Sequence, residues 1–101
     1  MDTNASVQEH YKKLIISIIN NTIPSCTVYL FGSRARGTQG EGSDIDIAID
    51  AGKPVSRFDL AQIKETIEES IIPYFVDAVD MQSTSMTMKN QILKEGIIWK
   101  T

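Results

Sequence analysis

The feature that most constrains this chain is a Gly-Ser pair followed, ten residues later, by an Asp-Ile-Asp sequence. Gly32-Ser33 directly follows segment 26–31, which is β-branched and aromatic, as a buried strand would be. Asp44-Ile45-Asp46 opens a second apolar segment that runs to Ile49. Glycine permits a sharp turn and a close approach of backbone to ligand. The pattern therefore predicts two strands that bring a polar turn and a pair of acids together.

The acid pair has the spacing of one strand face. Side chains alternate across a strand, so Asp44 and Asp46 are expected on the same side, about 7 Å apart at the backbone. Two like charges this close are unfavourable unless a cation or a shared proton compensates them. Hard oxygen ligands favour Mg²⁺ or Mn²⁺, and no His or Cys cluster indicates zinc. Taken alone, such a pair also fits an edge strand that shows its polar face to water.

A third carboxylate is expected on the predicted strand 74–81, which contains Asp77 and Asp80. Asp77 and Asp80 are three positions apart, an odd number, so their side chains point to opposite faces of the strand. A parallel third strand would bring Asp77 level with the acid pair. We therefore predict Asp77 as the third carboxylate and a solvent-facing Asp80 near the strand end, with the choice between them left open.

The Gly-Ser turn is the expected phosphate end of the site. Backbone N–H groups and the Ser33 hydroxyl could hold a triphosphate, and Arg36 and Arg34 could neutralise its charge. Solvated surface charge is an equally good reading of Arg34. Three carboxylates with divalent ions suit an in-line displacement at phosphorus. The glycine spacing also resembles a P-loop, but Thr38 stands where that motif requires lysine.

The predicted elements alternate along the chain. The first helix starts near Ser6, where Ser6 and Glu9 form a capping box, and ends at Asn20-Asn21. A strand (26–31), a polar loop and a second strand (44–49) follow. The next helix is capped by Ser56 and uses the stripe Leu60, Ile63, Ile67 and Ile71.

After the third strand, Gln82 to Ser85 are expected to cap a last helix that ends at Gly96. Its inward residues are predicted to be Met86, Ile92 and Leu93, and segment 97–99 is expected to pack back as an extended tail. The fold class is thus α/β (α+β), with a small mixed sheet of three main strands in the order α-β-loop-β-α-β-α. The crossover between strands two and three should be parallel and right-handed. The 101 residues fit one domain, 1–101.

Composition excludes several classes of function. A net charge of −3 lacks the basic footprint of duplex-binding proteins, so no direct nucleic-acid partner is expected. A lone Cys26 fits a reducing cytoplasm. No apolar run approaches the roughly 20 residues of a membrane span, so no membrane partner is expected.

The sequence Gly32-Ser-Arg-Ala-Arg-Gly37, followed by Ser43-Asp-Ile-Asp46, resembles the signature of the polymerase-β-like nucleotidyltransferases, and in particular the minimal nucleotidyltransferase (MNT) subgroup. The resemblance implies a metal-binding and catalytic set of Asp44, Asp46 and Asp77. It implies a nucleotide-binding set within the same motif: Gly32, Ser33, Arg34, Arg36 and Ser43. The implied cofactor is Mg²⁺, as one or two ions with Mn²⁺ as a substitute, and the implied nucleotide substrate is ATP.

Stand-alone proteins of this kind resemble the antitoxin half of MNT–HEPN toxin–antitoxin pairs. The resemblance implies transfer of AMP to a tyrosine of a HEPN ribonuclease, and hence a hetero-oligomer with that partner. The chain is also too short to carry a separate acceptor-binding domain. Two alternatives stay open: a nucleotidyltransferase for a small molecule, whose acceptor site a second subunit completes, and a non-catalytic antitoxin that acts by binding alone.

Overall fold

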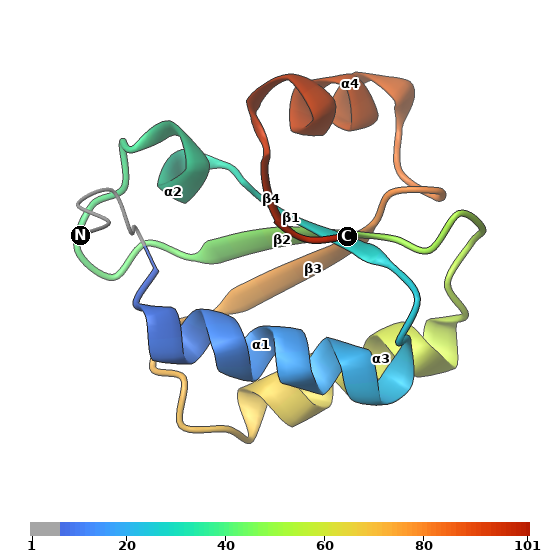
Figure 1. Cartoon of the computed structure of the whole chain (residues 1–101). Helices are drawn as coiled ribbons and strands as arrows, with labels where there is room; N and C mark the ends of the chain where they lie inside the picture. The colour runs from blue at the N-terminus through green and yellow to red at the C-terminus, as the bar shows by residue number, and fades with distance from the viewer. Residues whose placement is uncertain (1–6) are drawn as a thin grey trace.

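The computed structural model describes residues 7–101 and contains a four-stranded sheet in the order β3-β2-β1-β4 (Figure 1). The strands are β1 (Thr27–Phe31), β2 (Ile45–Asp50), β3 (Val76–Asp80) and β4 (Ile97–Lys100). β1 and β2 pair antiparallel, whereas β2 and β3 pair parallel. The prediction of a mixed sheet in an α+β fold is therefore confirmed.

Helices cover both faces of this sheet (Figure 1). The long helices α1 (Glu9–Thr22) and α3 (Arg57–Glu68) pack side by side on one face, where they enclose the main core with Ile45, Ile47 and Ile49 of β2. The short α2 (Ser33–Arg36) follows β1. Helix α4 (Met86–Glu95) lies on the opposite face, over a smaller cluster of Phe31, Ala48, Met81 and Ile92.

The alternation of β2 sorts its residues between these two faces. Because Ile45, Ile47 and Ile49 are buried against α1 and α3, the intervening Asp46 and Ala48 point to the α4 face. This is the face on which the chemistry was expected. The alternation of side chains along β2 therefore places the core on one face of the sheet and the candidate site on the other.

The sheet has one more strand than the three predicted. Residues expected to form an extended tail are β4, which pairs antiparallel with β1 through Leu30 with Ile97 and Tyr29 with Ile98. Trp99 packs against the main core as predicted, whereas Ile97 and Ile98, predicted to pack there too, are exposed. Without this strand, the backbone edge of β1 would have no ladder partner on that side.

The helix boundaries predicted at Ser56, Ser85 and Gly96 agree with the structure. Ser56 caps α3 by accepting a hydrogen bond from the Asp59 N–H at 3.0 Å, and Ser85 caps α4 by accepting one from Met88 at 3.1 Å. Gly96 ends α4. The start of α1 near Ser6 is wrong: the helix begins at Glu9, and Ser6 itself lies outside the described residues.

The predicted inward faces need correction at three positions. Met86 and Leu93 of α4 are exposed, because Ile92 and Met88 are the residues that contact the sheet. Ile71 lies beyond the end of α3 and is 76% exposed.

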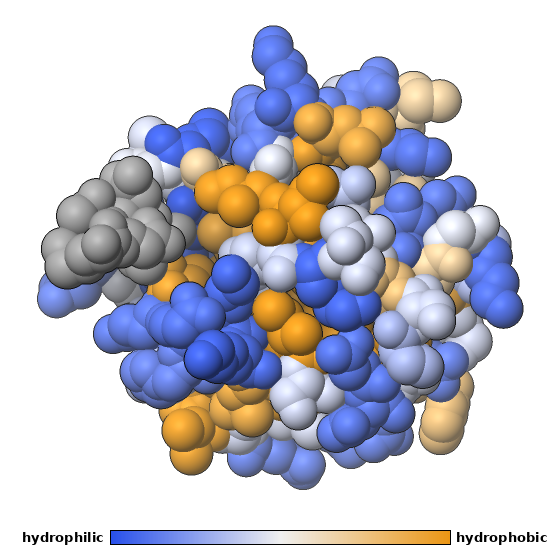
Figure 2. Space-filling view, viewed as in Figure 1, coloured by the Kyte–Doolittle hydropathy of each residue, from blue (hydrophilic) through white to orange (hydrophobic). Residues whose placement is uncertain are grey.

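Exposed apolar side chains of Leu93, Ile97 and Ile98 contribute to the hydrophobic surface that Figure 2 shows over α4 and β4. Within residues 7–101, no helix is long and apolar enough to cross a membrane.

Candidate active site

The Gly-Ser turn joins β1 to a single turn of helix. Gly32 has φ 76° and ψ −157°, a conformation that residues with side chains almost never adopt. Its carbonyl oxygen accepts hydrogen bonds from the N–H groups of Ala35 and Arg36, both at 3.1 Å. Gly37, in the left-handed region, ends the turn. The local sequence Gly-Ser-Arg-Ala-Arg-Gly thus makes a compact loop at the end of β1.

This turn lies directly against Asp46. A Cβ atom added to Gly32 would collide with the Asp46 carboxylate oxygen Oδ2 and would stand 3.2 Å from its Cγ. The contact follows from the β1–β2 ladder, in which Phe31 is the register partner of Asp46. Only glycine lets the two segments approach this closely, so the Gly-Ser turn and the acid end of the motif are in contact.

The carboxylates meet across two strands. Asp46 and Asp77 are register partners in the parallel β2–β3 ladder, so their side chains share a face about 4.8 Å apart at the backbone. Asp44 is exposed just before β2 begins. The prediction that a parallel third strand brings Asp77 level with the acid pair is confirmed by this register.

Electrostatics single out Asp46 within this group. Burial raises the pKa of the Asp46 carboxyl above its ordinary value, and the carboxylates of Asp77 and Asp44 raise it further. Arg36 and Arg34 lower it by a smaller amount. Burial and the two neighbouring acids therefore both disfavour the charged form of Asp46, and a bound cation would favour it again.

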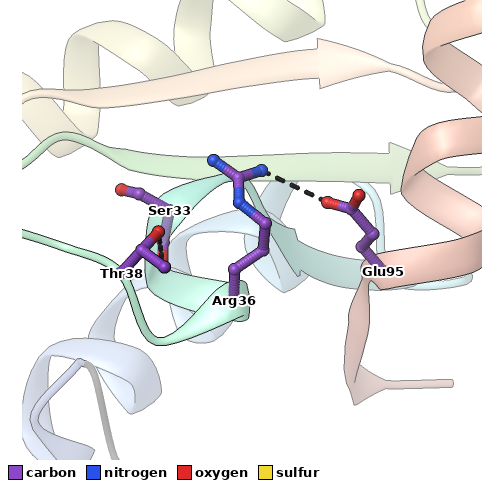
Figure 3. A network of polar contacts seen from close by, with 4 residues as sticks. All are labelled: Ser33, Arg36, Thr38 and Glu95. Atoms are coloured by element: carbon purple, nitrogen blue, oxygen red, sulfur yellow. Dashed lines mark hydrogen bonds and ion pairs between the residues drawn. The ribbon is translucent and has the colours of Figure 1, made fainter.

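Arg36 lies at the rim of the site. Figure 3 shows its guanidinium pointing away from the α2 backbone toward Glu95 at the end of α4, with Nη1 and Oε1 3.2 Å apart. The Arg36 side chain is 42% exposed. Beside it, the Ser33 carbonyl accepts bonds from the Thr38 N–H at 2.9 Å and the Thr38 hydroxyl at 3.5 Å. An exposed, singly paired arginine can turn toward an anionic ligand at little cost.

Arg34 and Ser43 are placed differently. The Arg34 side chain is buried, at 6% exposure, and its Nη2 and Nε donate to the Ser43 carbonyl at 2.6 and 3.0 Å. The Ser43 hydroxyl accepts from the Gly40 N–H at 2.8 Å. Both side chains therefore take part in holding the loop that leads into β2.

Asp80 is not the solvent-facing residue that the sequence predicts. It is 7% exposed and points to the α1/α3 side of the sheet. Its carboxylate accepts hydrogen bonds from the N–H groups of Val55 and Gln82 at 2.8 and 3.0 Å, and from the Ser83 hydroxyl at 2.8 Å. The prediction failed because these donors come from a loop 25 residues away and from the turn after β3. Asp80 ties these two segments together.

The donor chemistry fits a magnesium ion that is shared with a nucleotide. Within residues 7–101, no three acidic, His or Cys side chains converge closely enough to form a ready-made metal centre. Mg²⁺, however, is commonly held by one or two carboxylates together with substrate phosphate oxygens. The neighbouring carboxylates of Asp44, Asp46 and Asp77 and the adjoining Gly-Ser turn agree with this second type of site.

Two pockets flank the strands that carry the acids. One of about 520 Å³ lies at the far end of the β1–β2 pair, where Cys26, Thr27 and Asp50 contribute to its wall, and it shares no residue with the acid group. One of about 190 Å³ lies between α3 and the start of β3, and Asp77 is part of its lining. The second is too small for a whole nucleotide, since pockets for such ligands typically measure about 300–1,000 Å³.

Two residues near the site carried no signal in the sequence. Glu95, the partner of Arg36, lies 59 positions away along the chain. Tyr74 stacks its ring on the Arg34 guanidinium, with Cζ 4.4 Å from the ring centroid. Neither contact follows from periodicity or spacing, because each depends on how the sheet brings distant segments together.

The mixed sheet sets a Gly-Ser turn against paired aspartates, an arrangement that suits a phosphate group together with a divalent ion. The family described as Polymerase beta, Nucleotidyltransferase matches residues 13–100. The chain belongs to this nucleotidyltransferase family.

Several named proteins are similar over most of the chain. The protein adenylyltransferase MntA of Shewanella oneidensis is 35% identical, over 94% of this chain and 69% of its own length. A Haemophilus influenzae protein named "Probable protein adenylyltransferase MntA" is 32% identical, over 84% of this chain and 75% of its own length.

Solved structures show the same fold. A toxin–antitoxin crystal structure with AMP-PNP contains a chain that is 30% identical with a TM-score of 0.77, covering 88% of this chain and 72% of that one. A chain in a complex of tri-AMPylated Shewanella oneidensis HEPN toxin with MNT antitoxin is 25% identical with a TM-score of 0.74, covering 93% and 72%.

Proposed function

We propose that this chain transfers AMP from ATP to a tyrosine hydroxyl of a HEPN-type toxin and acts as the antitoxin of that partner. The observation that carries the proposal is the contact between Gly32 and the Asp46 carboxylate, beside Asp77. It joins a phosphate-binding turn to an acid group in a chain whose relatives are protein adenylyltransferases.

The Gly-Ser turn would bind the nucleotide. Backbone N–H groups and the hydroxyl of Ser33 would bind the β- and γ-phosphates, and Arg36 would leave Glu95 to pair with them. Gly32 keeps the turn close enough for these phosphates to lie beside Asp46. The exposed position of Arg36 supports this role, because its ion pair with Glu95 is weak.

The acid group would direct the displacement. The tyrosine oxygen attacks the α-phosphorus, a new O–P bond forms, the bond from the α-phosphorus to the bridging oxygen breaks, and pyrophosphate leaves. We assign acceptance of the tyrosine proton to Asp77, which lies beside Asp46 in the ladder. Asp44 and Asp46 would hold Mg²⁺, which, when bound, neutralises phosphate charge and stabilises the attacking and leaving oxygens.

The acceptor must reach this site from another molecule. Asp44 is exposed, and Asp46 and Asp77 are only partly buried, so the acid face is open to a partner. In the relatives, a HEPN toxin in complex with an MNT antitoxin is tri-AMPylated. The open face and this complex together support a protein acceptor for the present chain.

Intact mass spectrometry tests the proposal. The chain is incubated with ATP, Mg²⁺ and the HEPN-type protein encoded beside it, and the partner is weighed before and after. We expect a mass increase of one or more AMP units, which Asp46→Asn abolishes. Asp59→Asn, at the start of α3 and away from the acid group, serves as the matched control and should transfer normally.

Absence of any added AMP with the wild-type chain, or equal addition by Asp46→Asn, would contradict the proposal. If a variant lacking all three acids still neutralises the toxin in cells, the chain acts by binding alone. If AMP appears only on small hydroxyl compounds in an acceptor screen, the acceptor assignment is wrong although the chemistry stands.

A further inference from the structure

Arg34 and Arg36 lie two positions apart, yet their surroundings differ. Arg36 is exposed and pairs with one carboxylate, whereas Arg34 is buried and donates to backbone carbonyls. Its Nε and Nη2 reach the Ser43 oxygen at 3.0 and 2.6 Å, and Nε also reaches the Asp44 oxygen at 3.3 Å. The guanidinium thus binds the two residues that precede β2, one of which is the first acid of the site.

One face of the same guanidinium lies on the Tyr74 ring, with Cζ 4.4 Å from the centroid. Tyr74 in turn packs edge-on against Tyr11 of α1, at 6.1 Å between ring centroids and 86° between ring planes. Tyr74 lies just before β3, which carries Asp77. Arg34 therefore links the phosphate turn to the segments that lead into both acid-bearing strands.

The loop before Asp44 needs such a link. Gly37 and Gly42 both have positive φ, and the hydrogen bonds between Gly40 and Ser43 tie the loop only to itself. On the β2 side, the Ile45 N–H donates to the Phe75 carbonyl at 2.9 Å. Asp44 is thus held between the Arg34 guanidinium and the first bond of the β2–β3 ladder.

We infer that Arg34 is a positioning residue for nucleotidyl transfer, which acts by fixing the backbone of Ser43 and Asp44 so that the Asp44 carboxylate stays beside Asp46, and not by contacting phosphate. The inference rests on the proposed function for its reaction. A guanidinium that is buried, stacked and bound to two carbonyls would have to abandon these partners to reach a triphosphate. Displacing a reacting group by about 1 Å can cost about 100-fold in rate.

Steady-state kinetics separate positioning from phosphate binding. Arg34→Met keeps the apolar stem and should lower kcat by about 10- to 100-fold while the KM for ATP stays within about threefold. Arg36→Met should mainly raise the KM for ATP. Arg57→Met, at the exposed start of α3, is the control and should behave as wild type.

Conservative variants make the distinction sharper. Arg34→Lys keeps the positive charge but not the planar fork or the stacking, so it should fail to restore kcat. Tyr74→Leu removes the ring below the guanidinium and should lower kcat in the same direction, whereas Tyr74→Phe keeps the ring and should not. If Arg34→Met does not fold, the two Tyr74 variants still test the inference.

A readout without the acceptor keeps this inference separate from the proposed function. Mn²⁺ is titrated in the presence of AMP-PNP and followed by electron paramagnetic resonance, while AMP-PNP binding is measured by calorimetry. Arg34→Met should weaken Mn²⁺ binding about tenfold and leave AMP-PNP affinity without metal unchanged. This result would support the inference even if no AMP reached a protein acceptor.

Three results would overturn it: a raised KM for ATP at unchanged kcat in Arg34→Met, full rescue by Arg34→Lys, or wild-type kinetics and Mn²⁺ affinity in Arg34→Met. The first two would make Arg34 a phosphate contact, and the third would remove it from the reaction.

Discussion

Replacing Gly32 by alanine tests the contact on which the site is built. Gly32 combines φ 76° with ψ −157°, and an added Cβ would strike the Asp46 carboxylate. Holding an alanine in this backbone conformation costs about 1–3 kcal/mol, and overpacking the contact with Asp46 costs about 1–3 kcal/mol more. Since the Asp46 side chain can rotate away in part, we expect Gly32→Ala to lower the free energy of unfolding by about 2–4 kcal/mol.

Gly37→Ala provides the matched control. Gly37 also has a positive φ of 77°, but it lies in the left-handed region at ψ 17°, and nothing stands within 4 Å of its added Cβ. We expect a loss of about 1 kcal/mol. For a domain of this size, each kcal/mol corresponds to about 4–8 °C in Tm. Urea unfolding and thermal melts should therefore separate the two variants clearly, and only Gly32→Ala should lose AMP transfer.

A double-mutant cycle isolates the collision. Removing the carboxylate with Asp46→Ala should make Gly32→Ala less costly, with a coupling of about 1–2 kcal/mol. Additive losses in this cycle, or a Gly32→Ala variant that is no less stable than Gly37→Ala and transfers AMP at the wild-type rate, would refute the reasoning.

Four further variants test individual residues. Asp80→Ala should lower the free energy of unfolding by about 2–4 kcal/mol, because it leaves buried donors from Val55 and Gln82 without their acceptor. Asp77→Ala should abolish transfer with little effect on urea unfolding. If instead Asp80→Ala abolishes transfer and Asp77→Ala destabilises the fold, Asp80 is the third carboxylate. Burial and neighbouring acids raise the pKa of Asp46 in the folded chain. In EDTA, the contribution of Asp46 to stability should therefore be largest below the ordinary aspartate pKa and should be lost as pH rises through the raised pKa. Asp46→Asn should flatten that part of the pH profile, and an unchanged slope would contradict the assignment. Glu95→Gln should change stability by less than about 0.5 kcal/mol and lower the KM for ATP, since it releases Arg36 from an exposed pair; a raised KM would show that Glu95 assists nucleotide binding.

Rules that depend on neighbouring residues predicted much of the fold correctly. Caps at Ser56 and Ser85 and the stop at Gly96 could be read from the sequence because each depends on neighbours within a few residues. Likewise, strand alternation correctly placed Asp46 and Asp77 together and Asp80 on the other face. These features follow from backbone geometry that any tertiary context preserves.

By itself, then, the sequence determined the family, the order of the elements and the pairing of a glycine turn with two acids. Only the tertiary structure decided that segment 97–100 is a strand, that Asp80 is buried and that Arg34 faces the backbone of Ser43 and Asp44. Each of these depends on long-range pairing or on donors brought in by another segment. Such contacts leave no periodic trace, because their partners are distant in the chain and meet only when the sheet forms.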